Sequence, residues 1–155
     1  MRFFPENRKI DFVAQGRAGI DLYTAEKNTD FNETLSFNKF VGGSPGNITA
    51  MLAKIGRKTG LLTKVSDDLI GRYVISYFES IGTDISQITK DTTGGRTSLA
   101  ITEMKPDNCG VIIYRNNAAD QRLKPEEINE DYIANAAGLI VSGFEVILRD
   151  GCLEV

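Results

Sequence analysis

Histidine is absent from the 155 residues of this chain. Ser-His and Cys-His nucleophile pairs are therefore excluded, and so are zinc sites with histidine ligands. Any chemistry that the chain supports must use carboxylates, lysine, arginine, hydroxyl groups and backbone amides. We assign no metal ligands and no catalytic residue from the sequence.

Cysteine is scarce: Cys109 and Cys152 are the only two, and they form no CxxC motif. This usage is typical of a reducing, cytoplasmic setting without a disulfide framework. No apolar run approaches the roughly 20 residues that span a bilayer, and the N-terminal segment MRFFPENRKIDF lacks the features of a secretory signal. We therefore expect a cytoplasmic protein with no membrane partner.

Clustered positive charge is missing as well, since the net charge is −3 and the lysines and arginines are scattered. A nucleic-acid surface needs such clusters to neutralise phosphates, so we expect no nucleic-acid partner. Hydrophobic residues make up 41% of the chain and charged residues 25%, which is ordinary for a globular protein. The length of 155 residues fits one domain.

Two kinds of strand are predicted from the apolar pattern. Short apolar segments bounded by turn residues predict buried strands, and they lie at 12–20, 61–65 and 139–141. Segments in which apolar and polar residues alternate, or which flank a turn, predict a small, partly exposed sheet. They lie at 34–40, 97–103 and 111–114. A turn is expected at 105–108 between the last two.

Helices are predicted between these strands. Apolar residues at 48, 51, 52 and 55 share one helical face, and Gly56 provides the stop. A second helix carries apolar residues at 70, 74, 78 and 81, with Ser66 or Asp67 as its cap and Gly82 at its end. A third opens at 124–127. Strands alternating with helices indicate an α/β fold with a largely parallel sheet.

The segment Gly42-Gly43-Ser44-Pro45-Gly46-Asn47 opens the first of these helices. Its glycines allow a ligand to approach the backbone closely. The free amides at the helix start suit a hydroxyl-rich or anionic ligand. A tight structural loop with Asn47 as the helix cap explains the same residues, and local chemistry leaves both interpretations open.

Two further residues are candidates for binding. Asp21 lies just past the end of the first predicted strand, where ligands gather in open α/β sheets, and it could accept hydrogen bonds from two sugar hydroxyls. Arg115 follows the strand at 111–114, and its guanidinium could donate two hydrogen bonds to a carboxylate or to a pair of sugar hydroxyls. A solvated turn aspartate and an exposed ion-pairing arginine remain the alternatives. The pair Asp67-Asp68 is better explained by helix capping than by a ligand site.

The segment 42–71, GGSPGNITAMLAKIGRKTGLLTKVSDDLIG, resembles the N-terminal signature of the ribokinase-like (phosphofructokinase-B type) carbohydrate kinases. Five positions match that signature: Gly42, Gly43, Asn47, Thr49 and Gly56. Ser66 stands where the signature has a glycine. The resemblance covers residues 12–143.

Within that family, four stretches look like the 5-dehydro-2-deoxygluconokinases, sugar-acid kinases of myo-inositol catabolism. These stretches are 16–23, 37–48, 112–123 and 130–143. Fructokinases and 2-dehydro-3-deoxygluconokinases share weaker versions of them and are close alternatives. A non-catalytic sugar-binding module is an alternative of a different class.

The resemblance implies a ribokinase-like fold, with a central, mostly parallel sheet flanked by helices and a small β-sheet lid. The lid segments would be about 23–41 and 96–115. It further implies that Asp21, Gly43 and Asn47 bind sugar hydroxyls beside Gly42, and that Arg115 contacts the substrate from the lid. A homodimer through the lid is a further expectation.

The resemblance also implies ATP and Mg²⁺ for the intact family member. Its glycine-rich anion hole, of the form DTxGAGD with the catalytic base as the final Asp, belongs to a second half that we find no match for in residues 1–155. We therefore interpret 1–155 as the N-terminal portion of the kinase domain, inactive by itself and not expected to bind ATP or Mg²⁺ well. The tail 144–155 does not look like the family's continuation.

Overall fold

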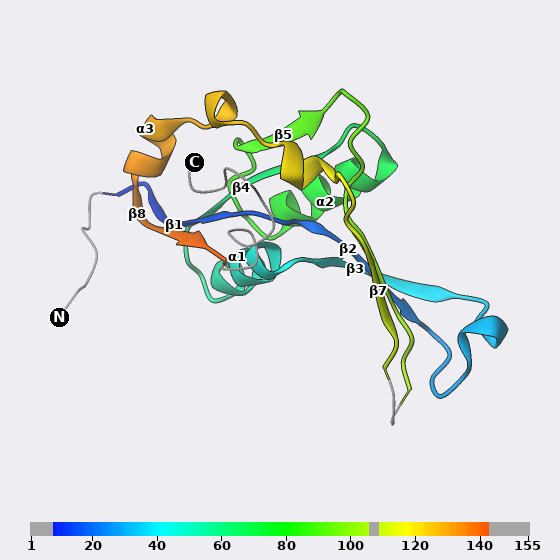
Figure 1. Ribbon diagram of the computed structural model, residues 1–155. Coiled ribbons are helices and arrows are strands. Elements are labelled where there is room, and N and C mark those ends of the chain that lie inside the picture. Colours follow the sequence, from blue (N-terminus) through cyan, green and yellow to red (C-terminus); the bar gives the residue numbers. More distant parts are fainter. Residues whose placement is uncertain (1–7, 106–108, 143–155) are drawn as a thin grey trace.

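The computed structural model describes residues 8–105 and 109–142, and its strands form two four-stranded sheets. The expected turn residues 106–108 and the tail from 143 lie outside this description. Figure 1 shows the second sheet projecting from one side of the main, helix-flanked sheet. No helix within the described ranges has the length and apolarity that a membrane crossing requires.

The main sheet has the order β5-β4-β1-β8, and every neighbouring pair in it is parallel. Its strands are β1 (Ile10–Gln15), β4 (Thr59–Ser66), β5 (Ile88–Asp91) and β8 (Ala136–Val141). All eight residues of β4 are buried, which is typical of a parallel strand covered on both faces. The predicted parallel sheet is therefore present. Strand β5 was not predicted, because its four residues show too short a pattern.

Each face of this sheet packs its own apolar cluster. On one face Ala14, Leu61 and Val65 pack with Val74 and Phe78 of α2 (Leu69–Ser80). On the other face Val13 and Leu62 pack with Leu123, beside η2 (Ala119–Arg122), η3 (Pro125–Glu127) and α3 (Glu130–Ala134). Neighbouring residues such as Val13 and Ala14 thus serve opposite faces, as strand geometry requires.

The second sheet has the order β3-β2-β6-β7. Its strands are β2 (Gly19–Thr24), β3 (Phe37–Gly42), β6 (Leu99–Thr102) and β7 (Val111–Tyr114), and a short turn of helix, η1 (Phe31–Glu33), precedes β3. Strand β2 pairs antiparallel with β3 and parallel with β6, and β6 pairs antiparallel with β7. All four residues of β7 are exposed, so this sheet is the partly exposed one that the alternating pattern predicts.

The single strand predicted at 12–20 is wrong, because the chain leaves one sheet and joins the other within it. Strand β1 ends at Gln15 and β2 begins at Gly19. Gly16 has a φ of 129°, a left-handed backbone conformation that glycine adopts without a Cβ clash. As a result Asp21 does not follow a strand of the main sheet. It is the third residue of β2, close to residues 16–18, which form the passage between the two sheets.

Helix α1 (Ser44–Lys54) is present and stops before Gly56, whose φ is 83°, as predicted. Its predicted apolar face is wrong. Met51 and Ile55 are 63% and 65% exposed, whereas the helix buries Pro45, Gly46, Thr49 and Ala50. Small residues face inward because the helix lies close to its neighbours, and a Cβ on Gly46 would meet Phe78 at 3.4 Å.

Two predicted helix starts are also corrected. The cap of α2 is Asp68, not Ser66 or Asp67, because its carboxylate accepts hydrogen bonds from the amides of Ile70 and Gly71. The predicted end at Gly82 is confirmed by its φ of 79°. The Pro125 segment forms only η3, and the α-helical turn α3 begins later, after its cap Asn129.

Candidate functional site

A cavity of about 470 Å³ lies where the second sheet meets the start of α1, and both Asp21 and Asn47 line it. Its other lining residues come from β2, the turn after β2, β3 and the end of β6: Tyr23, Thr24, Ala25, Lys27, Asn38, Phe40, Val41 and Met104. A volume in the range of about 300–1,000 Å³ is usual for small-molecule sites. Two of the sequence-predicted residues, far apart in the chain, are therefore brought to one cavity.

Asp21 is placed in this cavity by the pairing of β2 with β3, which sets it opposite Phe40. Its carboxylate lies against Gly42, where a Cβ would collide with the carboxylate oxygens. The glycine at 42 therefore makes room for the Asp21 side chain. At Gly42 the group that approaches the backbone closely is thus a side chain of the protein and not a ligand.

Gly43 is required by local packing as well. Its φ is 101°, and a Cβ there would collide with the carbonyl oxygen of Arg17. The same carbonyl accepts a hydrogen bond of 3.3 Å from the amide of Gly46 in the first turn of α1. The start of α1 is thus docked on the passage between the two sheets.

Arg17 is a site residue that the sequence interpretation missed. Its Nη2 lies 3.4 Å from Oδ1 of Asp21, and its Nε donates to Oγ of the buried Ser98 over 2.7 Å. The arginine side chain is 12% exposed and that of Asp21 is 18% exposed. Arg17 therefore orients one carboxylate oxygen of Asp21 while its backbone supports α1. The Arg-Asp spacing of four residues in GRAGID was the available signal.

Asn47 does not cap the helix, so the alternative interpretation of this residue is wrong. The cap is Gly43, and the amide of Asn47 already donates to the Gly43 carbonyl over 2.8 Å. Asn47 lies in the first turn of α1, is exposed, and lines the cavity. Its side-chain amide is available to a molecule in that cavity.

Arg115 follows β7 as predicted, yet it is not among the residues that line this cavity. Its side chain is 7% exposed, and its Nε donates to Oδ2 of Asp120 over 2.9 Å. Asp120 lies in η2, which packs against β4. In the described arrangement Arg115 therefore anchors the end of β7 to η2, and a substrate contact from Arg115 stays a prediction.

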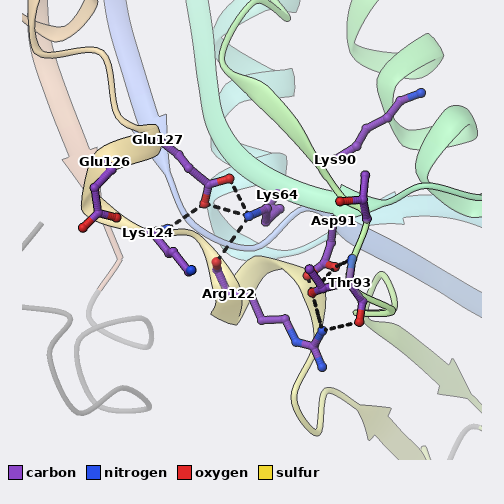
Figure 2. Close-up of a pocket in the computed structure, with 9 residues that line it drawn as sticks. Lys64, Lys90, Asp91, Thr93, Arg122, Lys124, Glu126 and Glu127 are labelled. Atoms are coloured by element: carbon purple, nitrogen blue, oxygen red, sulfur yellow. Dashed lines mark hydrogen bonds and ion pairs between the residues drawn. The ribbon is translucent and has the colours of Figure 1, made fainter.

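A second, larger cavity of about 720 Å³ lies beside β4 and β5, lined by four cations, three carboxylates and two threonines. Figure 2 shows Lys64 pointing toward Glu127 and the Arg122 carbonyl, whereas Lys90 points away from them. Lys64 Nζ lies 2.5 Å and 2.7 Å from the Glu127 carboxylate oxygens. Burial alone would raise the pKa of Glu127, but the hydrogen bonds from Lys64 and from the Lys124 amide, together with the positive charges of both lysines, outweigh it, so the pKa is lowered.

Asp91 closes the other side of this cavity. Its Oδ1 accepts hydrogen bonds from the amides of Thr93 and Gly95, and its Oδ2 lies 3.5 Å from Nη1 of Arg122. Burial opposes ionisation, but these bonds and the Thr93 hydroxyl outweigh it and lower the pKa of Asp91. Two ion pairs, Lys64 with Glu127 and Arg122 with Asp91, thus fasten η3 and η2 to the main sheet.

The segment Asp91-Thr92-Thr93-Gly94 shares the letters D-T-x-G with the family's anion-hole motif. The position of the motif's final Asp is Thr97, whose hydroxyl is hydrogen-bonded to Ser66. The amides that could hold an anion here bind the Asp91 carboxylate instead. This segment therefore supplies no catalytic base. Within the described ranges no group of three or more His, Cys, Asp and Glu could hold a metal ion.

Comparisons with known proteins agree on one family. A family profile described as "pfkB family carbohydrate kinase" matches residues 9–155. The expectation that the tail 144–155 departs from the family is therefore wrong, because the match includes that tail. The 5-dehydro-2-deoxygluconokinase of Bacillus velezensis is 48% identical over 141 residues, which are 90% of this chain and 43% of that protein. The chain thus spans less than half the length of the curated relatives that it matches.

Solved structures agree on the fold. A sugar kinase of Pyrococcus horikoshii, in complex with ATP, matches with a TM-score of 0.81 and 25% identity, over 92% of this chain and 46% of that one. The 2-dehydro-3-deoxygluconokinase of Thermotoga maritima matches with a TM-score of 0.84 and 22% identity, over 94% and 45%. The predicted ribokinase-like fold is confirmed.

Proposed function

Because this chain belongs to the pfkB family of carbohydrate kinases, we propose that it is the sugar-binding portion of an ATP-dependent kinase for 5-dehydro-2-deoxy-D-gluconate. The observation that carries the proposal is the 470 Å³ cavity that Asp21 and Asn47 share. These are the residues at which the family resemblance places sugar hydroxyls. The relatives named 5-dehydro-2-deoxygluconokinase support the choice of acceptor.

Each residue of the site has a role in this proposal. The Asp21 carboxylate accepts hydrogen bonds from two sugar hydroxyls through the oxygen that Arg17 leaves open. Asn47 binds a further hydroxyl from the first turn of α1, and Gly42 and Gly43 let the Asp21 side chain and the helix start approach each other. Arg115 would contact the substrate only after leaving Asp120.

The contribution of these residues to phosphoryl transfer is positioning. Transfer depends on holding the acceptor hydroxyl in line with the γ-phosphate and on neutralising charge. ATP and Mg²⁺ supply the phosphoryl group and part of that charge, and we assign neither to a residue of this chain. The base that takes the hydroxyl proton belongs to the second half of the family domain, so the chain by itself should bind the sugar acid without phosphorylating it.

The second sheet acts as the lid in this proposal and also as a dimer contact. Val111, Ile112, Ile113 and Tyr114 of β7 are each more than half exposed. An exposed apolar strand at a sheet edge invites association with another chain. Cys109, a free and exposed thiol, supports a reducing, cytoplasmic setting.

Calorimetric titration of the purified chain tests the function. We expect binding of 5-dehydro-2-deoxy-D-gluconate, weaker binding of 2-dehydro-3-deoxy-D-gluconate and D-fructose, and much weaker binding of the acid to Asp21→Asn than to the wild-type chain. A coupled assay with ATP and Mg²⁺ should show no turnover above background. Absence of binding to every sugar would refute the proposal, and sugar-dependent turnover would refute the assignment of the base to the second half of the family domain.

A further inference from the structure

Three lysines lie on the second sheet or its connecting turns, and two of them are already engaged. Lys39 Nζ lies 3.8 Å from the ring centre of Tyr73. Lys105 forms ion pairs with Asp30 and Glu103. Lys27 makes no ion pair with any carboxylate in residues 8–105 and 109–142, and it is exposed. Lys27 is thus the lid lysine with an uncompensated charge.

The backbone around Lys27 is held in place on both sides. The amide of Ala25 donates to the Ser36 carbonyl over 3.0 Å, and the amide of Asn28 donates to the Met104 carbonyl over 3.1 Å. The neighbouring carboxylate of Glu26 accepts the hydroxyl of Ser36 over 2.8 Å, and this hydrogen bond lowers its pKa. Glu26 is therefore hydrogen-bonded to Ser36, the residue before β3, while the Lys27 backbone has a defined position.

Lys27 lines the same 470 Å³ cavity as Asp21 and Asn47. Among the residues that the structure describes, Lys27 and Asp21 are the only charged ones that line it. Asp21 pairs with Arg17 and not with Lys27. Lys27 follows Asp21 by six residues in the chain, so the two Cα atoms are at most about 20 Å apart at about 3.3 Å per residue. Among the described residues, the cavity thus presents the Asp21 carboxylate, which can accept hydrogen bonds from hydroxyls, and the Lys27 ammonium, which has no ion-pair partner there.

From this arrangement we propose that Lys27 binds the carboxylate of a sugar acid and so selects sugar acids over neutral sugars. The inference rests on the proposed function and adds the group that recognises the acid. A carboxylate entering this cavity meets the negative charge of Asp21, which disfavours it unless a cation lies opposite. Lys27 offsets that repulsion and forms a charge-assisted hydrogen bond with the carboxylate. A neutral sugar has no carboxylate, so its affinity does not increase through Lys27.

The test is a calorimetric titration of the whole chain with two probes, 5-dehydro-2-deoxy-D-gluconate and the neutral keto-sugar D-fructose. Lys27→Ala and Lys27→Gln should each weaken binding of the acid by about 10- to 100-fold, the loss of one hydrogen bond to a charged group. Fructose binding should not change. Lys27→Arg should retain most of the affinity for the acid. The matched control is Lys39→Ala, which removes a lysine from β3 of the same sheet and should leave both affinities unchanged.

The dependence of the affinity on salt concentration distinguishes an ion pair between Lys27 and the acid from a steric effect of the substitution. Raising the ionic strength should weaken binding of the acid to the wild-type chain and have little effect on Lys27→Ala. If the wild-type chain binds the acid and the Lys27 variants bind it equally well, the lysine assignment is overturned and the proposed function stands. Tighter binding of fructose than of the acid by the wild-type chain overturns the selectivity. If the wild-type chain binds neither probe, both proposals fail.

Discussion

At the scale of single residues, the proposed sugar pocket contains two side chains, Asp21 and Asn47, whose partners differ. Asp21 has one oxygen directed to Arg17, and its carboxylate packs on Gly42, whereas Asn47 is exposed on the first turn of α1. Asp21 is therefore pre-oriented and charged, and Asn47 contributes neutral hydrogen bonds. Substitutions at the two positions should differ in cost for this reason.

Asp21→Asn keeps the size of the side chain but removes the charge and one acceptor. We expect it to weaken sugar binding by about 2–4 kcal/mol, and Asn47→Ala by about 1–2 kcal/mol, because hydrogen bonds to charged groups are the stronger ones. Calorimetric titration with the sugar acid gives both values. Equal affinities for both variants and the wild type would mean that the glycine loop is only structural.

Arg17 acts on the site through Asp21, so we regard it as a positioning residue. Arg17→Ala should weaken sugar binding by about 1.5–3 kcal/mol, because Asp21 loses its charged partner. Arg17→Lys keeps the charge but cannot reproduce the fork that reaches Ser98 and Asp21 together, so it should restore only part of the affinity. Ser98→Ala should weaken binding less than Arg17→Ala. Full affinity in Arg17→Ala would contradict this role.

At the scale of elements, the start of α2 explains the paired aspartates at 67 and 68. Asp68 Oδ1 accepts the amides of Ile70 and Gly71 over 2.9 Å and 3.1 Å and the hydroxyl of Ser66 over 2.7 Å. Asp67 has one ion pair with Lys90, in which both side chains are about half exposed. The first is a helix cap and the second is a surface pair.

Asp68→Ala should therefore lower the free energy of unfolding by about 1–2 kcal/mol, the usual cost of losing a cap. Asp67→Ala is the matched control one residue away, and it should cost less than about 0.5 kcal/mol, as for exposed ion pairs. Urea denaturation followed by circular dichroism measures both. Equal losses in the two variants would show that the capping interpretation is wrong.

At the scale of the whole molecule, acid should destabilise the fold through three carboxylates. The pKa values of Asp68, Asp91 and Glu127 are lowered. Burial opposes this in each case, and hydrogen bonds from Ser66, Thr93 and Lys64 are the largest of the contributions that outweigh it. A folded-state pKa below the unfolded-state value means that their stabilisation is present above about pH 4–4.5 and is lost as the pH falls through the folded-state values.

We therefore expect the free energy of unfolding to be nearly constant from pH 7 to pH 5 and to decrease below about pH 4. Asp91→Asn removes the titrating group from the end of β5 and should flatten that decrease. Urea titrations across this range measure it. Asp67→Ala serves as the control, and its pH profile should follow the wild type. A wild-type profile that stays level to pH 3 would contradict the assignment.

Association is the second property of the whole molecule. If the exposed apolar residues of β7 form a dimer contact, Ile112→Glu should convert the chain to a monomer on size-exclusion chromatography with light scattering. Met51→Glu places the same charge on an equally exposed apolar residue of α1 and should leave the oligomeric state unchanged. A wild-type monomer, or a dimer that survives Ile112→Glu, would rule out the lid contact.

The sequence by itself determined the α/β class, the start of α1 at the Gly-Gly segment and the helix ends at Gly56 and Gly82. These features depend on local periodicity and on backbone conformations that glycine permits. The family resemblance also implied one set of candidate binding residues, in advance of any contact between them: Asp21, Gly42, Gly43, Asn47 and Arg115.

Only the tertiary structure decided how those residues are used. Because the chain passes from one sheet to the other at 16–18, Asp21 lies in β2. Because α1 packs closely on its neighbours, it buries small residues and not its expected apolar face. Arg115 is held by its ion pair with Asp120 and does not line the cavity. Lys27 was recognised from the cavity that it lines, and Arg17 from its contacts with Asp21 and Ser98. The physical reason is that pairing between strands, helix approach and charge pairing join residues distant in the chain, and no local pattern encodes those partners.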